Sequence, residues 1–392
     1  MLIAPTITKV KACKVFNVFD YGAVGDGLTD DSKAISNAWH EACHKSKSSQ
    51  ILIPQGKYLI NPIVLKGPCK GHINMTINGR FMAPTDPKYW FGIDHWISFR
   101  YINGLIIGGH GVLDGQGHLA WSSNTCMKDP KCEKLPISLR LDFVNDSRVH
   151  HIGLINSKNV HMNIFSCHNI SIRDLKIRAP GSSPNTDGVH IGMSTNIIVS
   201  DSVISSGDDC VSLSRGTKNV DISNVKCGPG HGISIGSLGG CPNESEVEGL
   251  VVRNCNFIGT QNGLRIKTWA HSHSATVSNI TFEHIKMTDV FNPIVIDQQY
   301  CPFGNCDQGY SSKVQIRDVR FKHISGTSRS EVAVHLRCSD TNPCKNIMLK
   351  DINLDYTDGT ADSRCSNVFG VACGKQNPPS CMEQFGITCP HN

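Results

Sequence analysis

The sequence has few charged residues and few aromatic residues, and it lacks both basic blocks and long apolar runs. Charged residues make up 18 % of the 392 residues and aromatic residues 7 %. No run of lysine and arginine is interleaved with aromatic residues, so we expect no nucleic-acid partner. No apolar run reaches membrane-spanning length, so we expect no membrane partner either. The formal net charge of +5 is compatible with an acidic polymer as the partner.

Glycine and cysteine are abundant instead. The 36 glycines indicate many turns and few long helices. The 18 cysteines show no paired Cys-x-x-Cys spacing, and they predict structural disulfides in a secreted, extracellular protein. Five Asn-x-Ser/Thr tripeptides, which are acceptors for N-linked glycans, agree with secretion. They begin at Asn74, Asn145, Asn169, Asn243 and Asn279.

Acidic, imidazole and basic side chains gather in four short clusters between residues 185 and 267. Each cluster places a polar residue and a small residue before apolar residues two apart, and successive clusters follow at intervals of 22, 22 and 31 residues. Self-similarity at such a period predicts a solenoid in which each repeat forms one coil. The clusters are Asn185-Thr186-Asp187, Gly207-Asp208-Asp209-Cys210, Gly230-His231-Gly232 and Arg265-Ile266-Lys267.

Stacked coils would place these side chains on one ladder. Parallel strands of neighbouring coils lie about 4.8 Å apart. Asp187 and Asp209 are therefore expected one rung apart, with His231 on the next rung. Arg265 and Lys267 are two residues apart, so both side chains should leave the same outer face. Acids at one end of a face and cations at the other suit an anionic chain that is held and cut.

The repeat extends over much of the chain and predicts an all-β parallel β-helix. Each unit is two short strands separated by a polar turn, and the asparagine that leads most units is expected to bond its neighbours along the stack. The leading residues are Asn169, Asn196, Asn219, Asn279 and Asn346. A second recurring position accepts Asp, Asn or His and is interpreted as a turn without chemistry. It is assigned to Asp174, Asp201, Asp318 and Asp351, with Asn224, Asn254 and His284.

We expect a single domain over residues 1–392. Residues 13–48 predict a strand and a short amphipathic helix that caps the first coil. Residues 1–12 are interpreted as a disordered or expression-derived start, and residues 344–392 as a Cys-rich C-terminal cap. Disulfide pairing does not follow from cysteine counts, although a Cys210–Cys227 bond is attractive because it would tie the acidic turn to the turn that carries His231.

Three carboxylates and two cations fit the chemistry of glycoside hydrolysis. That reaction needs a protonated acid that releases the leaving oxygen and a carboxylate that activates water or attacks carbon. Adjacent Asp208 and Asp209, with Asp187 one coil below, repel one another as ions, which should raise the proton affinity of at least one. Arg265 and Lys267 would pair with a carboxylate of the substrate.

In this order and spacing the four clusters resemble those of the polygalacturonases of glycoside hydrolase family 28. The similarity covers nearly the whole chain, since the segment from Phe19 to Trp39 also resembles that of the plant members. The residues from Thr29 to Trp39 are most similar to plant pollen exopolygalacturonases. The resemblance implies a right-handed parallel β-helix and hydrolysis of α-1,4 galacturonosyl linkages in polygalacturonate (pectin), with inversion and without a metal or other cofactor. It also implies a cell-wall location and release of galacturonate from the non-reducing end, and we expect a monomer.

The resemblance implies roles for single residues by motif match. Catalytic roles fall to Asp208 as general acid, to Asp187 and Asp209 as the pair that holds and activates water, and to His231, which would shape the site and tune the acid. Substrate-binding roles fall to Arg265, Lys267, Tyr300 and Asn185.

Other functions remain open at this stage. An endo-acting polygalacturonase would differ only in how loops close the groove. A polysaccharide lyase on the same solenoid would cleave by elimination, usually with calcium and a basic proton acceptor. A non-catalytic pectin-binding β-helix is disfavoured by the presence of all three acids. Rhamnogalacturonan hydrolysis is disfavoured because Arg265 and Lys267 suit galacturonate.

Overall fold

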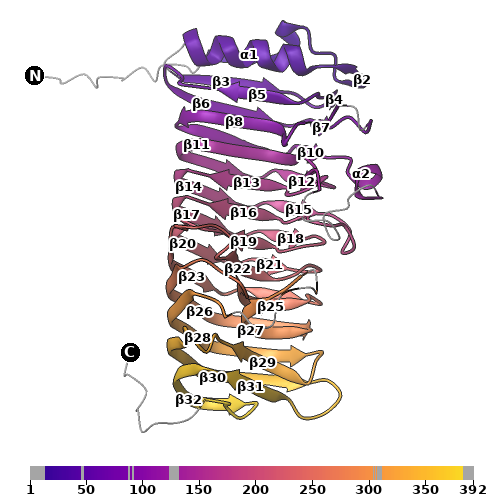
Figure 1. Ribbon diagram of the computed structural model, residues 1–392. Coiled ribbons are helices and arrows are strands. Elements are labelled where there is room, and N and C mark those ends of the chain that lie inside the picture. The colour runs from indigo at the N-terminus through magenta and orange to yellow at the C-terminus, as the bar shows by residue number, and fades with distance from the viewer. Residues whose placement is uncertain are drawn as a thin grey trace, which may run out of the picture.

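The computed structural model of the chain is one stack of coils with a helix across its first coil (Figure 1). It describes residues 14–382 apart from 46–47, 87–88, 91, 123–131, 303, 305 and 307–310. The predicted start at residues 1–12 lies outside this range. Strands of successive coils pair in parallel, so the predicted parallel β-helix is confirmed. None of the helices in the described residues combines the length and the apolar character that crossing a membrane requires.

Three faces run along the stack. The face that we name the carboxylate face follows the acidic clusters and carries the chemistry described below. Its strands are β5 (Ile63–Lys66), β8 (His95–Asn103), the first half of β11 (Ile137–His150), β13 (Met162–Phe165), β16 (Val189–Gly192), β19 (Val211–Leu213), β22 (Ile233–Leu238), β25 (Asn262–Trp269), β27 (Asn292–Tyr300), β29 (Val332–Arg337) and β31 (Asp362–Ser366).

The second face, which we name the asparagine face, begins in most coils near the leading asparagine. Its strands are β1 (Lys14–Asn17), β3 (Ser48–Ile53), β6 (His72–Ile77), β9 (Leu105–Gly109), the second half of β11, β14 (His168–Arg173), β17 (Thr195–Ser200), β20 (Lys218–Ser223), β23 (Val247–Arg253), β26 (Ala275–Val290), β28 (Val314–Ser328), β30 (Cys344–Tyr356) and β32 (Val368–Asn377).

The third face lies between the other two in each coil, and the last parts of β26, β28 and β30 extend it. Its own strands are β2 (Asp26–Asp30), β4 (Lys57–Leu59), β7 (Arg80–Met82), β10 (Val112–Asp114), β12 (Gly153–Ile155), β15 (Lys176–Arg178), β18 (Val203–Ser205), β21 (Lys226–Cys227) and β24 (Asn256–Ile258). The loops that lead from this face to the carboxylate face carry the acidic clusters.

The interior is filled by ladders of aliphatic side chains. The four residues Val189, Leu213, Ile235 and Ile266, which the alternation places inside, are fully buried. Burial of such a side chain on folding contributes about 1.5–3 kcal/mol to the stability of the fold. The ladders thus fix the register between coils, and with it the spacing of the outward side chains that alternate with them.

The first coil is covered by α1 (Ser32–Lys45), as the apolar stripe predicts. Ile35, Ala38 and Trp39 on this helix are buried against the stack, and the indole of Trp39 donates a hydrogen bond to the carbonyl of Lys66 at 3.1 Å. Two shorter helices are η1 (Val18–Tyr21) and α2 (His118–Ser122).

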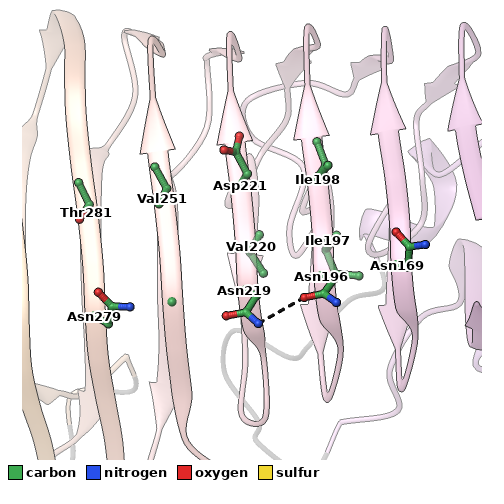
Figure 2. A pocket seen from close by; sticks show the side chains of 11 residues that line it. Asn169, Asn196, Ile197, Ile198, Asn219, Val220, Asp221, Val251, Asn279 and Thr281 are labelled. Carbon is green, nitrogen blue, oxygen red and sulfur yellow. Dashed lines mark hydrogen bonds between the residues drawn. The ribbon is translucent and has the colours of Figure 1, made fainter. Parts of the chain in front are cut away.

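The leading asparagines lie at a corner where the backbone is left-handed, with φ between 53° and 60°. Asparagine tolerates this conformation better than most residues. The predicted bonding along the stack is confirmed where Asn219 donates to Asn196 at 3.3 Å (Figure 2). Asn169 donates in the same way to Asp146, which occupies this position one coil earlier.

The predicted turn position is also left-handed, but the assignment of Asp318 to it is wrong. Asp318 lies in the leading position, between Asn279 and Asn346 in register, and it accepts a hydrogen bond from Asn346 at 2.6 Å. His323 occupies the turn position of that coil, and its ring stacks on His284 at 4.8 Å. The sequence pattern misleads here because an aspartate replaces the asparagine that marks the start of the repeat.

Disulfides staple the stack, as the cysteine content predicts. The expected Cys210–Cys227 bond is present. Residues 344–377 form β30, β31 and β32, so the expected start of the C-terminal cap falls inside the stack rather than after it. The other disulfides with both partners described are Cys43–Cys69, Cys301–Cys306, Cys338–Cys344 and Cys365–Cys381.

Candidate active site

The acidic clusters lie in successive loops that enter the carboxylate face. Asp187 precedes β16, Asp208 and Asp209 precede β19, and His231 precedes β22. The register of these strands aligns Val189 with Val211, each two residues after an aspartate. Asp187, Asp209 and His231 therefore occupy consecutive rungs, as the spacing predicts.

The residues that flank the acids in the sequence make buried contacts that hold the acidic loops in place. The hydroxyl of Thr186 is fully buried and accepts the backbone N–H of Gly207 at 3.0 Å, which joins the two acidic loops. A Cβ atom at Gly207 would lie 1.9 Å from the carbonyl oxygen of Ser183, so no larger residue fits there. The Cys210–Cys227 disulfide anchors the same loop from the other side.

Asp209 is buried, with 2 % of its surface exposed, and it is surrounded by donors. Its Oδ1 accepts from the Ser234 hydroxyl at 2.6 Å and from Arg265 Nη2 at 2.9 Å, and its Oδ2 accepts from Lys267 Nζ at 3.1 Å. Burial by itself would raise the pKa of this carboxyl, but the charges of Lys267 and Arg265 outweigh burial and lower the pKa to about 2. Asp209 is therefore an anion in mildly acidic and neutral solution.

Asp187 shows the opposite behaviour. Its Oδ2 accepts a hydrogen bond from the Ser212 hydroxyl at 2.7 Å. Burial, together with the neighbouring charges of Asp208 and Asp209, raises the pKa of Asp187 well above its ordinary value of 3.8. The expectation that mutual repulsion would raise the proton affinity of one carboxyl holds for Asp187.

Asp208 is more exposed to solvent than the adjacent Asp209. Its Oδ1 accepts the backbone N–H of Asp209 at 2.8 Å and lies 3.0 Å from Nδ1 of His231. The side chains of Asp208 and His231 are 17 % and 31 % exposed. Within the described ranges no partner contacts Oδ2 of Asp208, so this oxygen is free to meet a ligand.

The two cations converge on the acids from β25. Arg265 and Lys267 leave the same face, as predicted, and both are ion-paired with Asp209. The ring of Tyr300, at the end of β27, has its centroid 5.3 Å from Lys267 Nζ and 5.3 Å from the ring of Trp269. The structure thus gathers Tyr300 with the cations at one side of the acids.

Asn185 carries a polar atom without a partner. Its backbone is left-handed, with φ of 55°, and its Oδ1 is buried without a hydrogen bond from any residue that the structure describes. A buried acceptor of this kind is costly unless a ligand or water satisfies it. Asn185 can therefore serve as an acceptor for a bound molecule.

Three side chains that surround the acids are not among the residues predicted from the sequence. Ser212 and Ser234 donate to Asp187 and Asp209, and His190 lies 2.7 Å from Ser212. A signal for them was present, because His190, Ser212 and Ser234 are the outward residues between the two apolar ones in each aligned cluster. Their register was predictable, and their hydrogen bonds were not.

One group of side chains has the geometry to bind a cation. Asp208, Asp209 and His231 can each offer one ligand atom, and these atoms lie within 4.8 Å of one another. Lys267 and Arg265 already neutralise Asp209, which opposes a second positive charge at this point. The arrangement suits acid and base chemistry better than metal binding.

The sequence also contains His40-Glu41-Ala42-Cys43-His44, the His-Glu-x-x-His pattern found in zinc peptidases. On α1 the rings of His40 and His44 stack at 4.4 Å, and the carboxylate of Glu41 is bonded to the hydroxyl of Tyr21 at 2.7 Å. Cys43 is in a disulfide. No third metal ligand joins the pair among the residues with described positions, so this pattern belongs to the cap of the stack.

A shallow hollow of about 430 Å³ lies on the asparagine face (Figure 2). Ile198, Asp221, Val251 and Thr281 form a row across neighbouring strands there, beside the column of asparagines. Asp187, Asp208, Asp209, Arg265 and Lys267 lie on the carboxylate face or in the loops that enter it, and they do not line this hollow. It brings no catalytic side chains together.

Comparisons with known proteins cover nearly the whole chain. The sequence model of the family described as glycosyl hydrolases family 28 matches residues 43–375. An exopolygalacturonase of Platanus acerifolia is 45 % identical over 93 % of this chain and 97 % of that protein. An exopolygalacturonase of Arabidopsis thaliana is 47 % identical over 92 % of this chain and 82 % of that protein. The crystal structure of an endo-xylogalacturonan hydrolase from Aspergillus tubingensis is similar with a TM-score of 0.79 and 25 % identity, covering 93 % of this chain and 99 % of that chain.

Proposed function

The chain belongs to glycosyl hydrolases family 28, and we propose that it hydrolyses α-1,4-D-galacturonosyl linkages in polygalacturonate with inversion. We further propose exo action, with galacturonate released from the non-reducing end of the polymer. Two plant relatives that match most of the chain are named exopolygalacturonases, which supports polygalacturonate as the substrate and exo action.

The observation that carries the proposal is the contrast between two neighbouring carboxyl groups. Asp209 is held as an anion by Arg265 and Lys267, whereas the pKa of Asp187 is raised by burial and by the adjacent negative charges. Pairs of titratable groups whose surroundings separate their pKa values are the mark of acid and base assignments. Beside them, Asp208 presents one carboxyl oxygen without a partner among the described residues.

In the proposed reaction, Asp208 is the general acid. Its Oδ1 is engaged by the backbone N–H of Asp209 and by His231, so its Oδ2 is the oxygen that can carry a proton to the glycosidic oxygen. Water attacks the anomeric carbon from the opposite side while the bond to the leaving sugar breaks. Asp187 and Asp209 hold this water, and inversion follows from a single displacement.

The cations supply the specificity for a uronic acid. Arg265 and Lys267 each donate one hydrogen bond to Asp209, which leaves further N–H donors on both groups. A galacturonate carboxylate placed against them would form charge-assisted hydrogen bonds, with the guanidinium as a planar fork and the ammonium as a point charge. Tyr300 and the unpartnered oxygen of Asn185 are proposed as further contacts to the sugar.

We propose that the protein is a secreted, monomeric glycoprotein of the cell wall. The disulfides support an oxidising compartment. Four of the five glycan acceptors, Asn74, Asn169, Asn243 and Asn279, are exposed, as glycan attachment requires.

The test is incubation with polygalacturonate at mildly acidic pH, followed by a reducing-sugar assay and separation of the products. Galacturonate as the sole early product is expected, and a ladder of oligomers would replace exo with endo action. Unsaturated products or loss of activity with a chelator would indicate a lyase. Binding without release of reducing sugar would refute hydrolysis.

A further inference from the structure

Behind Asp187 lies a chain of two hydrogen bonds that the proposed reaction does not yet use. The Ser212 hydroxyl contacts Oδ2 of Asp187 at 2.7 Å, and Nδ1 of His190 contacts the same hydroxyl at 2.7 Å. Ser212 is 2 % exposed, and His190 and Ser212 are direct neighbours in register on β16 and β19. Both side chains point outward from the stack towards the acids, because they alternate with buried aliphatic residues.

The number of protons fixes the direction of these bonds. A serine hydroxyl has one proton to donate. When that proton is donated to the Asp187 carboxylate, Ser212 must accept at its oxygen, so His190 must donate from Nδ1. Burial lowers the pKa of His190 to about 4, which makes the neutral ring with its proton on Nδ1 the form that completes the chain in mildly acidic solution.

We propose that His190 and Ser212 are positioning residues that hold Asp187 as the proton acceptor for the hydrolytic water. The inference rests on the proposed function and assigns the two candidate acids separate tasks. Ser212 occupies Oδ2 of Asp187, and no described residue donates to Oδ1. The water therefore loses its proton to Oδ1, its oxygen bonds to the anomeric carbon, and the leaving oxygen takes the proton of Asp208.

Asp209 is less suited to accept this proton. Its two oxygens accept from Ser234, Arg265 and Lys267, and each of these donors favours the anion. A carboxylate with a high proton affinity is the better base in mildly acidic solution. Asp209 then serves to orient the water and to hold the two cations in place.

Other nearby charges also act on the protonation of Asp187 and His190. Asp208 and Asp209 favour a proton on Asp187, and Lys267 opposes it. At His190 the same two acids favour the protonated ring, whereas Lys267 and Lys134 disfavour it. These charged groups stay unchanged in variants of Ser212 and His190. A difference in pH dependence between such variants and the wild-type enzyme therefore reports the two hydrogen bonds behind Asp187.

Ser212→Ala tests the proposal on polygalacturonate through the pH dependence of kcat and kcat/KM. In the wild-type enzyme the bond from Ser212 favours the ionised form of Asp187. Its loss should therefore raise the pKa of Asp187 and move the acidic limb of kcat/KM to higher pH. We expect kcat to fall by about tenfold or more, with KM changed less than about twofold, as for loss of a bond to a charged group. Ser212→Thr keeps a hydroxyl and should return the limb towards its wild-type position. The substrate titrates identically with every variant and cancels.

Ser202→Ala is the matched control, because Ser202 is a buried serine with two hydrogen bonds in a neighbouring coil, away from the acids. It should lower the melting temperature without moving the acidic limb. A limb for Ser212→Ala that coincides with the wild-type limb would overturn the proposal, whatever its effect on stability.

A second pair of variants covers the case in which Ser212→Ala does not fold. His190→Asn places an amide N–H near the position of Nδ1, and His190→Phe fills the space without a donor. The proposal expects a near wild-type limb for the first and a shifted limb for the second, and equal limbs would overturn it. Failure of the wild-type enzyme to release sugar would instead refute the proposed function.

Discussion

Replacing Asp209 by asparagine should destabilise the fold in a pH-dependent manner. The pKa of Asp209 falls from an ordinary value of 3.8 to about 2, because Lys267 and Arg265 outweigh the effect of burial. One pKa unit corresponds to about 1.4 kcal/mol, so the ionised carboxylate contributes about 2 kcal/mol more to the free energy of unfolding than its neutral form does. Asp209→Asn has the shape of the neutral form and should lose this amount.

The sign of the pH dependence follows from the direction of the shift. A carboxyl whose pKa is lower in the folded state stabilises the fold above its unfolded pKa, and this contribution disappears as the pH falls through the folded value. The difference between wild-type protein and Asp209→Asn should therefore be full at pH 5 and shrink as the pH falls from about 4 towards about 2.

Urea unfolding followed by tryptophan fluorescence, at pH 5 and at about pH 2.5, measures this difference. Asp358→Asn is the control, since Asp358 is an exposed carboxylate in the turn that follows β30. It should change stability little at either pH. A loss for Asp209→Asn that is equal at both pH values, or no loss at pH 5, would show that the ion pairs with Arg265 and Lys267 do not stabilise the fold.

Three further outcomes are expected. Asp208→Asn should lower kcat by roughly 10³-fold with an unchanged circular dichroism spectrum, because the proton donor is lost; near-normal turnover would remove Asp208 from the role of acid. Lys267→Ala should chiefly raise KM for oligogalacturonates in steady-state assays, and unchanged KM and kcat would argue against a contact with the substrate carboxylate. Cys210→Ser combined with Cys227→Ser should lower the free energy of unfolding by about 3 kcal/mol, the value for a closed loop of this length. Equal urea midpoints for this variant and the wild-type protein would contradict that estimate.

The arrangement of the acids could be predicted from the sequence because each coil repeats one alternation. Once Val189 and Val211 are placed inside, the residues two positions before them must share a ladder, and Asp187 and Asp209 do so. The same logic failed at Asp318, where the marker asparagine is replaced and the alignment slipped by five positions.

Electrostatic roles could not be predicted in this way. Spacing places Arg265 and Lys267 on the right face, but it does not show that both side chains reach back to Asp209, more than 50 residues earlier in the chain. Which carboxyl becomes a strong acid and which a weak one depends on these contacts. The repeat pattern also leaves open that His190 reaches Asp187 through Ser212, because a hydrogen bond depends on side-chain rotamers.

The acids, the imidazole and the cations come from four successive coils, so no single repeat holds a working set. A coil added at either end of the stack would leave their mutual distances unchanged. A coil inserted between β19 and β25 would carry Arg265 and Lys267 about 5 Å further from Asp209 and break both ion pairs. Growth or shortening of such a chain is therefore tolerated at the ends and in the loops, while the number of central coils stays fixed.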